Sequence, residues 1–77
     1  MKVSVRGFGS LSRYFSGNDG TAELELAEGA TVASVLERLS IPEADAWRVT
    51  VNSQFASSDY CLQDGDAVSL FAYVGGG

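Results

Sequence analysis

Residues 21–39 read TAELELAEGATVASVLERL, and two periodicities meet within them. From Ala22 to Leu26 apolar and polar residues alternate, with the two-residue period of a strand that buries one face. The second half places apolar residues at i, i+3, i+4 and i+7, the spacing of one helical face; they are Val32, Val35, Leu36 and Leu39. This stretch therefore predicts a half-buried strand followed by an amphipathic helix of about two turns.

The ends of the helix are also marked in the sequence. Glu28-Gly29-Ala30 interrupts the strand pattern, and Thr31 is a residue type that caps helix N-termini by accepting an unpaired backbone N–H. Pro42 prevents the helix from continuing, because proline lacks the amide donor and clashes with the preceding turn. A short helical turn is predicted at residues 43–46.

Three further segments alternate like strands, at residues 2–6, 48–52 and 68–74, and a turn at 52–54 predicts a short return strand at 55–56. A single helix needs one sheet face to cover it, so the chain predicts an α+β two-layer domain. The order of elements favours a β-grasp fold with a mixed sheet of four to five strands, in which the last strand lies beside the first.

Size and charge limit the possible functions. Seventy-seven residues make one domain, predicted at residues 1–74 with a flexible glycine tail at 75–77. The net charge of −5 and five scattered basic residues argue against a nucleic-acid or anionic-membrane partner. One cysteine permits no intramolecular disulfide, and no long apolar stretch resembles a signal peptide or a membrane span. We expect a soluble cytoplasmic protein.

The chain ends in Val74-Gly75-Gly76-Gly77. Glycines add nothing to a core, but a tail without side chains can enter a narrow cleft and present its carboxylate there. That carboxylate is ionised at neutral pH and can attack an activated phosphate that a partner supplies. By themselves, the glycines are better explained as a frayed terminus.

Strand parity places some aromatic residues on the face away from the helix. If Val68 and Leu70 face the helix, Phe71 and Tyr73 point to the opposite side. Phe8 shares the parity of the polar residues of the first strand. A small two-layer domain has nothing to cover that face, so exposed rings there predict a docking patch. A bulge at Gly7 would reverse Phe8, and parity does not place Phe55, which follows a turn.

Other candidate sites have simpler interpretations. Asp59, Asp64 and Asp66 could ligate a hard cation, although turns before a strand explain them more simply. Cys61 is predicted to be a small, partly buried residue. The chain has no histidine and no acid–base constellation, so we expect it not to be an enzyme.

Taken in order, several segments resemble the ubiquitin-like sulfur carriers of the MoaD/ThiS type, closest to the small subunit of molybdopterin synthase. These segments are Val3 to Leu11, Thr31 to Leu36, Val51-Asn52, Leu62 to Val68, Phe71 and the terminal Val74-Gly75-Gly76-Gly77. Ala72-Tyr73 stands where the molybdopterin type often has Pro-Pro, and Ser12 where it often has Arg.

The resemblance implies a carried substrate. An E1-like partner would use ATP and Mg²⁺ to adenylate Gly77, which then becomes a thiocarboxylate, with Gly76 unobstructed beside it; the chain itself would bind no cofactor. Its partner-binding residues would be Phe8, Phe55 and Phe71 together with Tyr73, Val74 and Gly75. The sulfur acceptor would be the large subunit of molybdopterin synthase. Two other acceptors stay open, a thiamine-thiazole synthase and another sulfur-accepting synthase. A different role also stays open, that of a ubiquitin-like modifier or interaction module.

Overall fold

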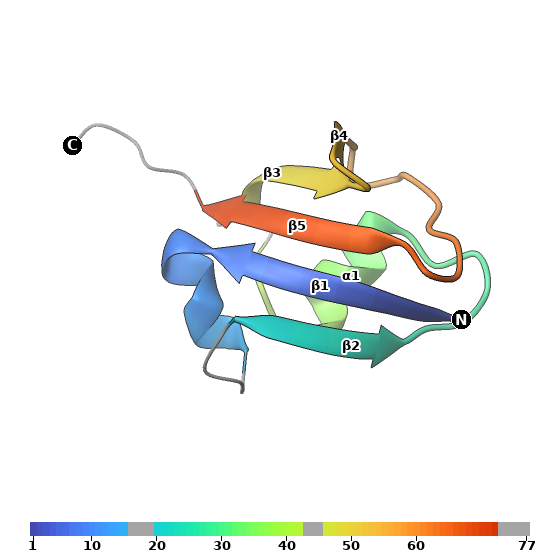
Figure 1. Ribbon diagram of the computed structural model, residues 1–77, viewed down its shortest axis with the longest axis horizontal. Helices are drawn as coiled ribbons and strands as arrows, with labels where there is room; N and C mark the ends of the chain where they lie inside the picture. The colour runs from blue at the N-terminus through green and yellow to red at the C-terminus, as the bar shows by residue number, and fades with distance from the viewer. Residues whose placement is uncertain (16–19, 43–45, 73–77) are drawn as a thin grey trace.

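A computed structural model describes residues 1–15, 20–42 and 46–72, with the backbone alone described for residues 46 and 47. The five strands are β1 (Lys2–Phe8), β2 (Thr21–Glu25), β3 (Ala46–Val51), β4 (Gln54–Phe55) and β5 (Ala67–Ala72). They form one sheet in the order β2-β1-β5-β3-β4 (Figure 1). β1 and β5 are parallel and the other neighbours are antiparallel, so the sheet is mixed and the last strand lies beside the first, as predicted.

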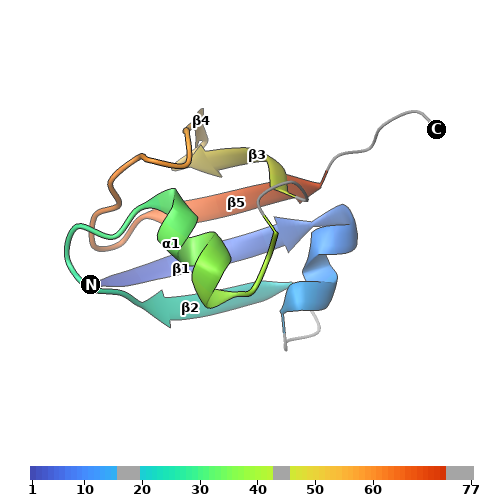
Figure 2. The ribbon, with the colours of Figure 1, turned by 180° about the vertical axis from the view of Figure 1, so that it is seen from behind.

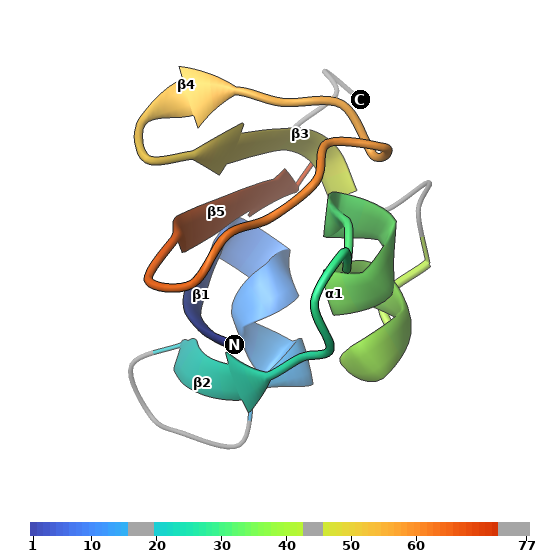
Figure 3. The ribbon, with the colours of Figure 1, turned by 90° about the vertical axis from the view of Figure 1, so that its right-hand side faces the viewer.

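The single α-helix of the described residues, α1 (Val32–Arg38), lies across one face of the sheet (Figure 2). Seen from the side, the sheet and α1 form two layers, and no helix in the described part of the chain covers the other sheet face (Figure 3). We call that uncovered side the open face. The predicted α+β β-grasp architecture is confirmed.

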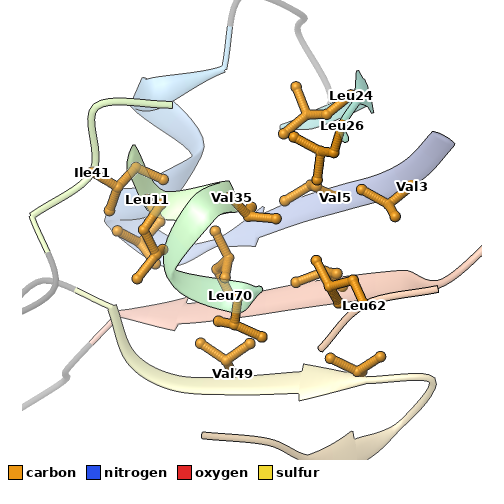
Figure 4. Close-up of a cluster of buried hydrophobic side chains, with 14 of the residues drawn as sticks. Val3, Val5, Leu11, Leu24, Leu26, Val35, Ile41, Val49, Leu62 and Leu70 are labelled. Carbon is orange, nitrogen blue, oxygen red and sulfur yellow. The ribbon is translucent and has the colours of Figure 1, made fainter. Parts of the chain in front are cut away.

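The core fills the space between these layers (Figure 4). The four longer strands contribute alternate residues to it, as the sequence periodicity predicted, and α1 contributes its apolar stripe. The buried apolar residues are Val3, Val5, Leu11, Phe15, Leu24, Leu26, Val32, Val35, Leu36, Ile41, Val49, Val51, Leu62, Val68 and Leu70.

Local signals set the ends of α1. Thr31 is the N-cap, as predicted, and its backbone N–H donates to Oγ of Ser34 at 3.1 Å in a capping box. At the other end Ser40 adopts a positive φ of 58°, and the N–H of Ile41 returns to the carbonyl of Leu36 at 2.9 Å. This closing turn directs Ile41 into the core.

The short 3₁₀ helix η1 (Gly9–Tyr14) follows β1 and was not predicted. It begins at Gly9, whose φ of 65° suits a residue without a side chain, and it buries Leu11. Phe15 then covers Gly7 so closely that a Cβ there would collide with ring atom Cε1. The absence of a side chain at Gly7 therefore lets the ring of Phe15 pack closely on β1, which stays a regular strand.

A polar network connects the β3–β4 turn to the start of β5. The turn residues Asn52 and Ser53 both have positive φ, which is the requirement of a type I′ hairpin turn. Asp66 is 7% exposed and accepts hydrogen bonds from Nδ2 of Asn52 at 2.9 Å and from the N–H of Gln63 at 2.8 Å. Oδ1 of Asn52 accepts from the N–H of Ala67 at 3.0 Å. These bonds hold β5 in register beside β3.

Two local expectations were wrong. Cys61 is exposed, because the neighbouring Leu62 takes the inward position and is buried. Ala46 begins β3, where it pairs with Ala72, so it does not end a helical turn; residues 43–45 lie outside the description. Of the helices that the structure describes, none is long and apolar enough to cross a membrane.

Candidate partner-docking site

Of the predicted site residues, the structure describes Phe8, Phe55 and Phe71. Tyr73, Val74, Gly75, Gly76 and Gly77, and with them the predicted tail at 75–77, lie outside the described residues. The site is therefore built from the three rings and the strands that carry them.

Phe8 and Phe71 meet on the open face. Val5 and Gly7 face inward on β1, and Leu70 faces inward on β5, so the two rings point outward by parity. The parallel register pairs Phe8 directly with Phe71. Their rings stack with centroids 4.9 Å apart and planes 6° from parallel. The bulge at Gly7 considered as an alternative is absent, because the β1–β5 pairing runs without interruption through Gly7.

Phe55 reaches the same face from β4. It pairs with Thr50, whose neighbours Val49 and Val51 are buried, so Phe55 shares the outward side of β3. Phe55 is 71% exposed, whereas Phe8 is 37% exposed. The exposed ring of Phe55 is therefore a large apolar area for one residue of a small domain. The register, and not the local sequence, places this ring.

Two arginines that sequence reasoning treated as scattered surface charges join the rings. The guanidinium carbon of Arg6 lies 5.2 Å from the centroid of the Phe8 ring, and that of Arg48 lies 4.8 Å from the centroid of Phe55. Arg48 also pairs with Phe71 across β3 and β5. Both distances suit cation–π contact. The i, i+2 spacing of Arg6 and Phe8 was a usable signal, whereas nothing local marked Arg48.

Arg6, Phe8, Phe71, Arg48 and Phe55 together form what we call the aromatic–arginine cluster. It crosses four neighbouring strands, β1, β5, β3 and β4, and includes the end of the sheet where β1 and β5 both finish (Figure 1). The chain leaves β5 at Ala72, directly after Phe71. A partner that grips this cluster thus holds the domain close to the point from which the C-terminal residues depart.

The aspartates considered as cation ligands instead form turns. Asp64 accepts a hydrogen bond from the N–H of Lys2 at 2.7 Å, and Asp66 accepts hydrogen bonds from Gln63 and Asn52. Asp59 accepts a hydrogen bond from the hydroxyl of Ser57. Over the described ranges, no three acidic, cysteine or histidine side chains gather in a way that could hold a metal ion. These carboxylates therefore stabilise the loops around the sheet.

Comparisons with known proteins agree with this architecture. The model of the ThiS family matches residues 8–77. No curated protein sequence matches the chain. Among solved structures, a putative molybdopterin converting factor, subunit 1, from Pyrococcus furiosus is 30% identical with a TM-score of 0.74, over 96% of this chain and 99% of that chain.

Two more distant structures share the fold. The small archaeal modifier protein 1 of H. volcanii is 20% identical with a TM-score of 0.76, over 95% of this chain and 98% of that one. A complex of subunits 1 and 2 of the molybdopterin-converting factor from Helicobacter pylori contains a chain that is 22% identical, with a TM-score of 0.60 and full coverage of both chains. At these identities the likeness concerns the fold.

Proposed function

Because the chain belongs to the ThiS family of ubiquitin-like sulfur carriers, whose members are small carriers and not catalysts, we propose that it carries sulfur on Gly77. An E1-like partner would use ATP and Mg²⁺ to join the Gly77 carboxylate to AMP, with release of pyrophosphate. A sulfur donor would then displace AMP and leave a thiocarboxylate. Activation followed by substitution divides one difficult step into two easier ones.

The observation that supports this proposal is that Phe8 and Phe71 of the aromatic–arginine cluster lie next to Ala72, the last residue that the structure describes. Five residues follow Ala72, and fully extended they span at most about 17 Å. A partner that binds Phe8 and Phe71 would therefore find the reacting carboxylate within that reach. Positioning and electrostatic stabilisation would come from the partner, and the carrier needs no general base.

For the sulfur acceptor, we propose the large subunit of a molybdopterin synthase. The 30% identical P. furiosus protein is named as a putative subunit 1 of the molybdopterin converting factor, and the H. pylori structure joins subunits 1 and 2 of that factor. A thiazole synthase or another sulfur-accepting synthase is the alternative acceptor within the same carrier role. We place the protein in the cytoplasm, where these partners would meet it.

Sulfur loading is the direct test. The full chain is incubated with the E1-like protein of the same organism, ATP, Mg²⁺ and a sulfur donor, and its intact mass is measured. We expect a gain equal to one oxygen-to-sulfur exchange, mapped to Gly77 by fragmentation. Deletion of Gly76 and Gly77 should abolish the gain while the thermal transition stays in place, because the last buried core residue of β5 is Leu70. Loading of the deleted form would contradict the proposal.

A role as a protein modifier predicts a different product, in which Gly77 forms an isopeptide bond with a lysine of another protein. Lys2 is the one lysine of this chain, so chains linked through its own lysines could grow only there. Species of higher mass that vanish in a Lys2→Arg variant would show self-conjugation. A carrier would produce the thiocarboxylate and no such species.

A further inference from the structure

The strand β2 ends the sheet on one side, and no described strand pairs with its outer side (Figure 1). We propose that this edge pairs antiparallel with an extended segment of another protein that carries lysine or arginine at every second position. The inference goes beyond the proposed function, because β2 contributes no residue to the aromatic–arginine cluster and the contact does not require the chemistry of Gly77.

The register of β2 decides which of its backbone groups point outward. The N–H of Leu26, directly after β2, donates to the carbonyl of Met1 at 2.8 Å. In an antiparallel pair, residues that bond to the neighbouring strand alternate with residues whose backbone groups point away from it. The even-numbered residues of β2 therefore bond to β1, and Glu23 and Glu25 present their backbone groups to the free edge.

One of these outward groups is already bonded. Nη1 of Arg38 donates to the carbonyl of Glu25 at 3.2 Å, which agrees with the outward direction of that carbonyl. Within the described ranges, nothing bonds to Glu23 on this side. The N–H and the carbonyl of Glu23 and the N–H of Glu25 are thus available to an added strand. Main-chain hydrogen bonds to such an edge are the usual way in which an extended segment joins a sheet.

The charges on this edge disfavour a second copy of the chain as the added strand. Leu24 faces the core, so the side chains of Glu23 and Glu25 both lie on the open face. In an antiparallel pair of two β2 strands that matches both glutamates, Glu23 faces either Glu23 or Glu25 of the other copy. Like charges directly opposite each other destabilise a strand pair.

The same carboxylates favour a basic segment. Side chains of directly opposite residues on neighbouring strands contact each other, so a lysine or arginine opposite Glu23 forms an ion pair with it. Within β1 the residue opposite Glu23 is the uncharged Ser4, and Glu23 forms no ion pair among the described residues. Glu25 lies 3.4 Å from the N-terminal ammonium of Met1, yet its side chain stays 70% exposed.

An open groove continues the edge beyond the end of β2. It measures about 580 Å³ and is lined by residues 26–30 together with Ser34, Glu37 and Arg38 of α1. Its lining combines apolar side chains with the carboxylates of Glu28 and Glu37. A lysine or arginine side chain has the same two parts, an apolar stem and a cationic head. The groove therefore suits a further basic residue of the added segment, while Arg38 bonds to the backbone of β2.

Amide hydrogen exchange in the full chain tests the inference. In the protein alone, the amides of Glu23 and Glu25 should exchange quickly, whereas the amide of Leu24, which points to β1, should exchange slowly. The probe is a short synthetic peptide of alternating lysine and valine, blocked at both ends. At about 1 mM it should slow the exchange of the Glu23 amide about tenfold and leave Leu24 unchanged.

Two methylated peptides separate strand pairing from charge attraction. Methylation of the backbone nitrogens of the lysines removes the donors that face β2 when the lysine side chains lie opposite Glu23, and it should abolish the protection. Methylation of the valine nitrogens alters the outer side of the added strand and should leave the protection in place. Equal protection by both peptides, or none by the unmodified peptide, overturns the inference. Protection that appears without peptide as the protein concentration rises identifies a second copy as the occupant and overturns it too.

Charge reversal on the edge supplies a matched pair of variants. Glu23→Lys should raise the Kd for the lysine–valine peptide about tenfold and lead to binding of a glutamate–valine peptide instead. Asp59→Lys makes the same charge change in the loop that bonds to the N-terminus of α1, and its Kd should stay within about twofold of wild type. An equal loss in both variants would show unspecific attraction and refute the inference. Neither measurement involves Gly77, so a failure of the carrier role would leave these results unchanged.

Discussion

Adjacent residues of β5 allow binding and stability to be separated by single substitutions. Phe71 points to the open face and stacks on Phe8, while Leu70 points to the core and is 0% exposed. We predict that Phe71→Asp weakens partner binding with a small loss of stability, and that Leu70→Ala does the reverse. The two residues are neighbours on one strand, so the two variants differ mainly in the sheet face to which the side chain points.

The magnitudes follow from the contacts. Loss of an aromatic stack costs about 1 kcal/mol, which lowers Tm by roughly 6 °C in a domain of this size. Leucine-to-alanine replacement at a fully buried site costs about 3 kcal/mol, or about 18 °C at the same conversion. At the interface, removal of a central aromatic anchor costs about 2 kcal/mol, which corresponds to roughly a 30-fold rise in Kd.

Two measurements check this prediction. Thermal unfolding followed by circular dichroism gives Tm, and calorimetric titration against the E1-like partner gives Kd at a temperature where both variants are folded. A loss of Tm for Phe71→Asp as large as that for Leu70→Ala would show that the ring is a core residue. Unchanged affinity of Phe71→Asp would show that the aromatic–arginine cluster is not the docking surface.

Three further predictions concern the scaffold, and thermal unfolding measures each. Ser53→Gly should raise stability by about 0.5–1 kcal/mol, because φ at Ser53 is 71° and glycine adopts it without strain; a lower Tm would contradict the assigned turn. Gly7→Ala should cost about 1–3 kcal/mol, since its Cβ would collide with the ring of Phe15, and a neutral effect would show that the ring moves aside freely. Asp66→Ala should cost about 2–3 kcal/mol by leaving the donors of Gln63 and Asn52 without their acceptor; retention of full stability would show that water replaces the carboxylate.

Much of the fold could be predicted because strand and helix periodicity are local. The alternation around Val3, Leu24 and Val68 follows from backbone geometry, as does the stripe that begins after Thr31. The predicted strands and helix appear with their ends shifted by a few residues. The 3₁₀ helix after β1 was missed because Leu11 lies in it without any repeating pattern. Cys61 was misplaced because nothing local distinguishes it from Leu62 as the inward residue.

For the site, the sequence by itself determined the outward direction of Phe71 and the glycine-rich end of the chain, whereas the direction of Phe8 depended on the β1–β5 pairing, which excludes a bulge at Gly7. Only the tertiary structure decided that Phe8 and Phe71 stack, that Phe55 shares their face, and that Arg48 lies beside both Phe71 and Phe55. Parity is a property of one strand, so it can be read from neighbouring residues. Register joins strands far apart in the chain, and between Ala46 and Arg48 it includes an irregularity that no local pattern encodes.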